Sequence, residues 1–98
     1  MGKIVHIVLW KLKPSISAAT ATAAIDALKS VPGPISAHLG PPAISDRAKG
    51  YNYGLYSVFE SREALDTYAV SEAHVKVVVE NVRPHVDDVL AYDFELPQ

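Results

Sequence analysis

Two side chains that could carry acid–base chemistry lie within one short stretch of this chain, between positions 68 and 79. Tyr68 and His74 flank a predicted break near Ser71, where one helical pattern ends and another begins. Histidine is the side chain that most readily takes up and releases a proton near neutral pH. A tyrosine hydroxyl can donate a hydrogen bond to a developing negative charge. We therefore expect the candidate site at this junction, with the rest of the chain as its scaffold.

Length and composition predict a single globular domain spanning residues 1–98. The chain is 49% apolar and 20% charged, which is typical of a folded domain and not of a disordered or fibrous chain. The nine basic and eleven acidic residues give a formal net charge of −2. Since binding to phosphates normally requires a basic surface, we expect no nucleic-acid partner.

The residue types that are missing narrow the chemistry further. Cysteine is absent, which excludes disulfides, thiolate metal sites and cysteine nucleophiles. The four histidines are far apart and no phosphate-binding or dinucleotide-binding motif occurs, so we expect neither a metal nor a cofactor. No signal peptide and no apolar run long enough to cross a bilayer is evident. The expectation is a cytoplasmic protein without a membrane partner.

Apolar periodicity divides the chain into alternating strand and helix patterns. Strands are expected at 4–10, 35–39, 51–60 and 89–96, and helices at about 15–31 and from 61 to 84 with the break near Ser71. Serines at positions 15 or 17 and at 61 can cap the helices. This order predicts a ferredoxin-like βαββαβ domain of the α+β class, with an antiparallel sheet and helices on one face. The second strand is expected at an edge, and the loop 43–50 is a plausible flap.

Each predicted helix presents an apolar stripe that should face the sheet. The expected inward residues are Ala21, Ala24, Ile25 and Leu28 in the first helix, Leu65, Tyr68 and Ala69 in the second, and Val75, Val78, Val79 and Val82 after the break.

The first strand is apolar on both faces, and in so small a domain helices can cover only one of them. The residues expected on the uncovered face are Val8, Trp10, Leu55 and Phe59, with His6, Tyr53, Ser57, Ala91 and Asp93 as small or polar interruptions. We therefore predict that a second copy packs sheet to sheet, forming a homodimer that encloses a barrel-like space.

Four segments resemble the stress-responsive A/B barrel (Dabb) family. They are the opening strand from Val5 to Lys13, Gly50-Tyr51 with Phe59-Glu60-Ser61 around the third strand, the stretch from Tyr68 to Val75, and the closing Tyr92-Asp93-Phe94. The resemblance spans nearly the whole chain and is weakest over residues 41–49. It implies a dimeric α+β barrel, which is also what the first strand predicts by being apolar on both faces.

The family includes polyketide cyclases of the olivetolic acid cyclase type, which close a linear tetraketide by aldol condensation without a cofactor. The resemblance implies that His74 acts as general base and that Tyr68 assists it. Taken together with the apolar residues predicted to line the barrel, the resemblance implies that the substrate-binding residues are His6, Val8, Trp10, Tyr53, Leu55 and Asp93. The sequence also departs from the cyclase pattern. Ser71-Glu72 replaces the usual His-Pro, Tyr53 stands where the cyclase has a histidine, and alanine near Ala24 replaces a tyrosine.

Two functions remain open at this point. The first is a cofactor-free cyclase or lyase that acts on a small hydrophobic polyketide or phenolic substrate. The second is a non-catalytic, stress-responsive dimer that binds a small apolar ligand or acts through assembly, in which Tyr68 and His74 only fix the helix break and Asp93 only orients His6. An open cavity that reaches from His74 to Tyr68, with His6 and Asp93 facing it, would favour the enzyme.

Overall fold

The structure, a computed structural model, describes residues 2–97. Its elements are β1 (Ile4–Leu12), α1 (Ala18–Ile25), β2 (Ser36–Gly40), β3 (Tyr53–Phe59), α2 (Arg62–Val70), α3 (Glu72–Val77) and β4 (Val86–Glu95). A 3₁₀ turn, Asp26–Ser30, extends α1, and a short 3₁₀ turn, Ser45–Arg47, lies in the loop before β3. A π-helical turn, Val78–Val82, extends α3 and leads through the 3₁₀ turn Arg83–His85 into β4.

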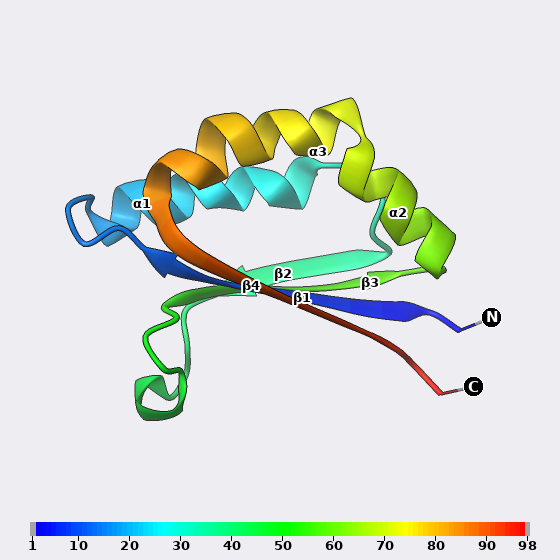
Figure 1. Ribbon diagram of the computed structural model, residues 1–98, viewed down its shortest axis with the longest axis horizontal. Helices are drawn as coiled ribbons and strands as arrows, with labels where there is room; N and C mark the ends of the chain where they lie inside the picture. The colour runs from blue at the N-terminus through cyan, green and yellow to red at the C-terminus, as the bar shows by residue number, and fades with distance from the viewer. Residues whose placement is uncertain (1, 98) are drawn as a thin grey trace.

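The four strands form one antiparallel sheet in the order β2-β3-β1-β4. Figure 1 shows α1, α2 and α3 together on one side of this sheet, while the other side carries no α-helix, only the loop with the short 3₁₀ turn before β3. The predicted ferredoxin-like α+β fold is therefore confirmed, and β2 lies at an edge as expected. No helix within residues 2–97 has the length and apolar content needed to cross a membrane.

The strand register shows which side chains share a face of the sheet. Val8 of β1 lies opposite Leu55 of β3 and Ala91 of β4, and all three point toward the helices. The neighbouring Leu9 lies opposite Gly54 and Leu90, on the other face. Successive residues of a strand alternate between the two faces, so this register assigns every side chain of the sheet.

The prediction that Val8, Trp10, Leu55 and Phe59 lie on the uncovered face is wrong. All four are buried in the layer between the sheet and the helices. The predicted interruptions His6, Tyr53, Ser57, Ala91 and Asp93 share their face. Alternation groups residues correctly, but a period of two does not say which group the helices cover. The uncovered face carries Ile7, Leu9, Tyr56, Leu90, Tyr92 and Phe94 instead.

Serine caps begin the helices where the sequence predicts them. The Ser17 hydroxyl accepts the backbone N–H of Thr20, and the Ser61 hydroxyl accepts that of Ala64, each at 3.1 Å. Each bond satisfies one of the free N–H groups at a helix start. Ser71 ends α2 and caps α3, which confirms the predicted break.

The predicted stripe of α1 is borne out at Ala21, Ile25 and Leu28, which are buried. The stripe after the break is only partly right, because Val75 and Val79 are 45% and 46% exposed. Ala69 of α2 is exposed as well. The inward positions are His74, Val77, Val78 and Val82. The spacing of the inward residues is helical as predicted. The inward face begins one residue earlier than predicted, at His74, because a polar histidine occupies an inward position.

The loop predicted as a flap lies away from the helices. Arg47, Ala48 and Lys49 border a hollow with Leu9 and Leu90 of the uncovered face, and Figure 1 shows the loop on the helix-free side of the sheet. It therefore does not close over the layer that contains Tyr68 and His74.

Candidate functional site

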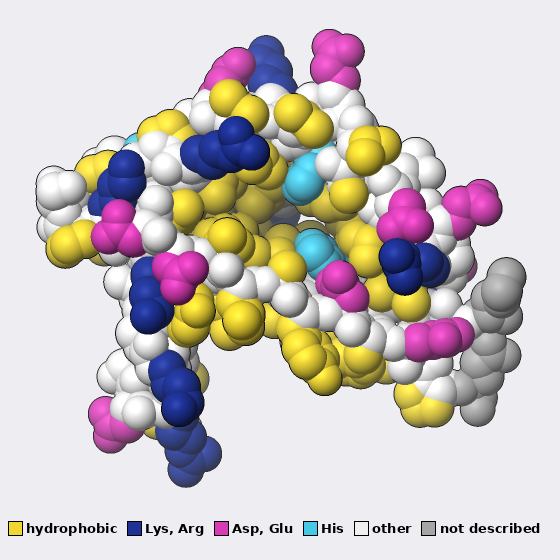
Figure 2. All heavy atoms as spheres, viewed as in Figure 1, with side chains coloured by type: hydrophobic (Ala, Val, Ile, Leu, Met, Phe, Trp, Pro, Cys, Tyr) yellow, Lys and Arg dark blue, Asp and Glu magenta, His cyan; other side chains and the backbone are white. Residues whose placement is uncertain are grey.

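A cavity of about 330 Å³ lies between the helices and the sheet of the single chain. Figure 2 shows it as a hollow with apolar walls and histidine side chains on two opposite sides. The lining residues are His6, Val8, Trp10, Leu28, Leu55, Tyr68, His74, Val78, Val82, Arg83, Val86, Val89 and Ala91. The cavity thus joins Tyr68 and His74 with His6, as the sequence predicts, but the chain's own helices bound it, not a partner's sheet.

The helix break holds His74 in a defined orientation. The His74 backbone N–H donates to the Ser71 hydroxyl at 3.3 Å, and that hydroxyl donates to the Tyr68 carbonyl oxygen at 2.8 Å. The ring Nδ1 lies 3.1 Å from the carbonyl oxygen of Ala69. A carbonyl oxygen only accepts, so Nδ1 carries the proton and Nε2 is left with a free lone pair. His74 is therefore held in the tautomer that a base requires.

Tyr68 packs beside this imidazole and is 4% exposed. Its ring centroid is 4.3 Å from that of His74 and 4.9 Å from that of Phe59. Burial raises the pKa of the Tyr68 hydroxyl above its usual value, so the group is a neutral hydrogen-bond donor at physiological pH. Within residues 2–97 the Tyr68 hydroxyl has no hydrogen-bond partner. Every fully buried side-chain oxygen or nitrogen of these residues does have a partner, so the Tyr68 hydroxyl is not fully buried. The hydroxyl is therefore accessible.

His6 lies on the sheet wall of the cavity. It faces Asp93 in the β1–β4 register, and its Nδ1 is hydrogen-bonded to the Asp93 carboxylate. A carboxylate accepts this bond, so Nδ1 carries a proton, and Nε2 has no hydrogen-bond partner within residues 2–97. From β3, Ser57 donates to the His6 carbonyl oxygen at 3.0 Å, and the Phe59 ring meets the imidazole edge-on at 6.0 Å.

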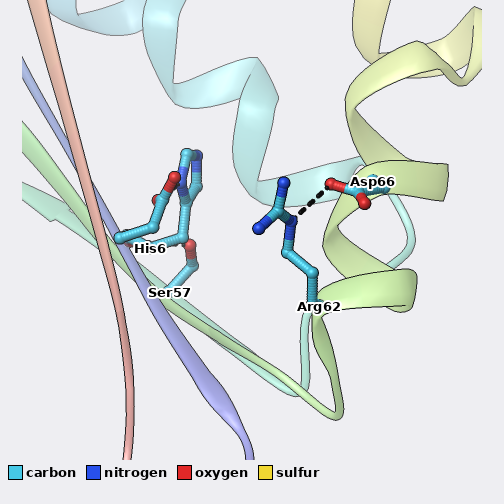
Figure 3. Close-up of polar contacts among 5 residues, drawn as sticks. His6, Ser57, Arg62 and Asp66 are labelled. Atoms are coloured by element: carbon cyan, nitrogen blue, oxygen red, sulfur yellow. Dashed lines mark hydrogen bonds and ion pairs between the residues drawn. The ribbon is translucent and has the colours of Figure 1, made fainter.

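Asp93 does not line the cavity but borders an adjacent hollow with Arg62 and Asp66 of α2. Figure 3 shows Arg62 reaching from α2 toward His6 and Ser57, with its guanidinium bonded to Asp66. The Nε–Oδ1 distance of that bond is 3.0 Å. The hydrogen bond to Asp66 and, to a lesser extent, the charge of Asp93 raise the pKa of Arg62 above its usual value. The carboxylate that orients His6 thus faces a permanent positive charge.

Trp10 forms a wall of the cavity, and Tyr53 lies behind it. The two rings are stacked with centroids 6.3 Å apart and an angle of 27°. The Tyr53 hydroxyl donates to the Asp26 carboxylate at the end of α1, and burial together with this bond raises the pKa of Tyr53 to about 12. Tyr53 therefore supports the wall from outside, whereas the other predicted binding residues Val8, Trp10 and Leu55 line the cavity directly.

The sequence indicated only one residue of the lining that follows Val78. Val82, in the π-helical turn, was predicted to face inward, whereas Arg83, Val86 and Val89, from the 3₁₀ turn and the start of β4, were not. A π-helical turn leaves no reliable mark in a sequence, although such turns occur often at functional sites. The continuous valine pattern up to Pro84 was the available signal, and it predicted only a helix.

The assembled groups suit proton transfer at carbon. Two imidazoles, each with its Nδ1 already hydrogen-bonded, and one neutral phenol meet in a space whose other lining residues are apolar except for Arg83. One imidazole can take a proton while the phenol stabilises the resulting oxyanion. Residues 2–97 contain no group of three or more His, Asp or Glu side chains placed to hold a metal ion.

The family model of the Dabb family, the stress-responsive A/B barrel domain, matches residues 4–96. Among curated proteins the chain is similar to a stress-response A/B barrel domain-containing protein of Arabidopsis thaliana. The two are 34% identical over 94 residues, which cover 93% of this chain and 36% of the Arabidopsis protein. The chain thus spans about a third of that relative.

Two solved structures illustrate the likeness in three dimensions. A dimeric ferredoxin-like protein of unknown function from Jannaschia sp. CCS1 is 28% identical, with a TM-score of 0.70 and coverage of 97% of this chain and 100% of that one. The hydroxynitrile lyase of Passiflora edulis is 19% identical, with a TM-score of 0.81 and coverage of 99% and 95%. At 19% identity, the similarity to the lyase shows only that the two proteins share a fold.

Proposed function

This chain belongs to the stress-responsive A/B barrel (Dabb) family, and we propose that it is a cofactor-free cyclase or lyase. Its substrate in this proposal is a small hydrophobic polyketide or phenolic compound, and His74 is the general base. The observation that carries the proposal is the tautomer of His74. Its Nδ1 proton is committed to the Ala69 carbonyl, which leaves a basic Nε2 in a cavity shared with Tyr68 and His6.

The proposed reaction begins when His74 Nε2 takes a proton from a carbon between two carbonyl groups. The electron pair of that C–H bond becomes an enolate, whose oxygen accepts a hydrogen bond from the Tyr68 hydroxyl. The carbon then attacks a second carbonyl of the same chain, forming a C–C bond and an alkoxide. The imidazolium of His74 returns its proton to the alkoxide, so the enzyme ends as it began.

The cavity limits the size of the substrate. Benzene fills a cavity of about 150 Å³, and the space here is about 330 Å³. One six-membered ring with a short side chain therefore fits, and the apolar walls favour its folded conformation over an extended one. The exclusion of water also strengthens the hydrogen bond from the tyrosine.

A structural neighbour gives the enzymatic proposal indirect support. The hydroxynitrile lyase of Passiflora edulis places a lyase on this fold, so the fold is compatible with enzyme activity. The non-catalytic alternative, a barrel that binds an apolar ligand, uses the same cavity, and in it the hydrogen bonds of His74 and His6 only fix the helix break and the sheet.

We further infer that the protein is a homodimer formed through the helix-free face of its sheet. Tyr56, Leu90, Tyr92 and Phe94 are exposed there, and a monomeric protein rarely leaves so continuous an apolar surface in water. The Jannaschia protein, which shares this fold, is dimeric. In this arrangement each cavity stays on the outer side of its own sheet.

The experiment compares turnover of a triketide or tetraketide, offered as a thioester and as a free acid, by the wild-type protein and by His74→Ala. We expect kcat/KM to fall by about 10²- to 10⁴-fold, which is the usual contribution of a general base. His38→Ala is the matched control for turnover, since His38 lies outside the cavity on β2, opposite Tyr56 of the uncovered face. Its oligomeric state is checked alongside that of His74→Ala. Full activity in His74→Ala would refute the role of this base. Ligand binding without any turnover would instead favour the non-catalytic barrel.

A further inference from the structure

We propose that the substrate of this cavity carries a carboxylate and that Arg83 binds it at the mouth. The inference rests on the proposed function, which it deepens by naming the charged group of the substrate. No residue match to a cyclase suggests it, and it depends only on where the chain places one guanidinium.

Arg83 is the single permanently charged side chain among the residues that line the cavity. The other lining residues are aliphatic, aromatic or histidine. An ionised carboxylate is costly to bury in such surroundings unless a cation and hydrogen bonds compensate it. A substrate with an acid group would therefore bind with its apolar part inside and its carboxylate at the exposed edge, where Arg83 stands.

The backbone on both sides of Arg83 is fixed by side-chain hydrogen bonds. The Asn81 amide donates to the Ala24 carbonyl oxygen of α1 at 3.0 Å, and His85 Nδ1 donates to the Asn81 carbonyl oxygen at 2.7 Å. The His85 carbonyl oxygen in turn accepts the backbone N–H of Lys13 at 2.9 Å. These bonds attach the turn to α1 and to the end of β1, so the base of the arginine side chain has a defined position.

The Arg83 guanidinium has no hydrogen bond or ion pair within residues 2–97. Arg62 offers the contrast, because its guanidinium is bonded to Asp66 one helical turn away. A guanidinium presents a planar fork of donors that matches the two oxygens of a carboxylate. The unused fork of Arg83 at the edge of an apolar cavity thus fits an acid better than a neutral ester.

A carboxylate bound at this edge would also orient the substrate. The acid fixes one end of the molecule, so the distance along its chain decides which carbon reaches His74. Apart from Arg83, the polar side chains that line the cavity are His6, Tyr68 and His74. A fixed carboxylate would therefore give the cavity a means of choosing one reactive carbon among several.

The test uses two ligands of the same shape, 3-phenylpropanoate and its neutral amide. Trp10 is the only tryptophan of the chain and lines the cavity, so its fluorescence reports binding directly. The wild-type protein should bind the acid more tightly than the amide. Arg83→Gln should weaken binding of the acid about tenfold at low salt and leave the amide unchanged, while Arg83→Lys should retain part of the preference.

Lys76→Gln is the matched control, because Lys76 is an exposed cation of α3 that lies outside the cavity lining. The inference is overturned if Lys76→Gln weakens binding of the acid as much as Arg83→Gln does, or if the wild-type protein binds the acid and the amide equally well. It is also overturned if neither the acid nor the amide changes the fluorescence of Trp10. Its failure is distinct from that of the proposed function. An acid preference that persists in His74→Ala supports the role of Arg83 whatever happens to turnover.

Discussion

Replacing Tyr92 by aspartate should convert the protein from dimers to folded monomers. Tyr92 lies near the middle of β4 on the helix-free face of the sheet and is 62% exposed in the single chain. It lies opposite Ile7 of β1 in the register, beside a row of further apolar side chains. If this face packs against a second sheet, Tyr92 is covered, and a carboxylate in its place would be buried among apolar groups without a partner.

The size of the effect follows from the exposed fraction. A tyrosine buries roughly 200 Å² when fully covered, so 62% corresponds to about 120 Å² that the partner could cover. At about 25 cal/mol per Å² this is about 3 kcal/mol. A twofold interface contains the substitution twice, which gives about 6 kcal/mol before losses of side-chain freedom are subtracted. We expect dimer dissociation to become easier by at least about a thousandfold.

Sedimentation equilibrium at micromolar concentration measures this change, and circular dichroism checks that the variant is folded. Val70→Asp is the control, because Val70 is 79% exposed on α2 and lies on the helix side of the molecule. It should remain dimeric. A wild-type protein that sediments as a folded monomer, or a Tyr92→Asp variant as dimeric as Val70→Asp, would refute the assignment of this face.

Two further predictions concern the supports of the site. Ser71→Ala should lower the free energy of unfolding by about 1 kcal/mol, since it removes the cap of α3. Ser71→Thr should restore most of this loss, and urea unfolding measures both variants. Equal midpoints for the wild type and the two variants would contradict the capping role. The pKa of Tyr53 is raised from 10.0 to about 12 by burial and by Asp26, so its stabilising effect is complete below about pH 10 and is lost as the pH rises toward 12. Melting temperatures measured from pH 9 to 12 should therefore fall less steeply for Tyr53→Phe than for the wild type, and parallel curves would show that the bond to Asp26 is not maintained.

The local features of the fold were predictable because each depends on neighbours in sequence. Ser17 and Ser61 cap helices as predicted, because each serine directly precedes a helical apolar pattern, and the predicted break falls at Ser71. The alternation of β3 correctly groups Tyr53 with Leu55 and Phe59 in the sheet. These signals need no information about the rest of the chain.

The composition of the site was predictable only in part. His6, Tyr68 and His74 do meet in one cavity, and the resemblance to a family carried that prediction further than periodicity did. Arg83 was missed because its position depends on a π-helical turn. That turn is held by an amide of Asn81 on a carbonyl of α1, a contact between segments 57 residues apart.

The sequence by itself determined the order of the elements, the starts of the helices and the two groups of side chains on the sheet. It did so because capping and alternation are set by residues a few positions apart. Only the tertiary structure decided which group the helices cover, and hence that the cavity belongs to one chain while the opposite face of the sheet stays uncovered in the single chain. A strand pattern with a period of two is symmetric between its faces, and the packing of distant helices breaks that symmetry. The same packing also brings His6 and His74 to one cavity with the Nδ1 of each already hydrogen-bonded, which no pattern of residue types could indicate.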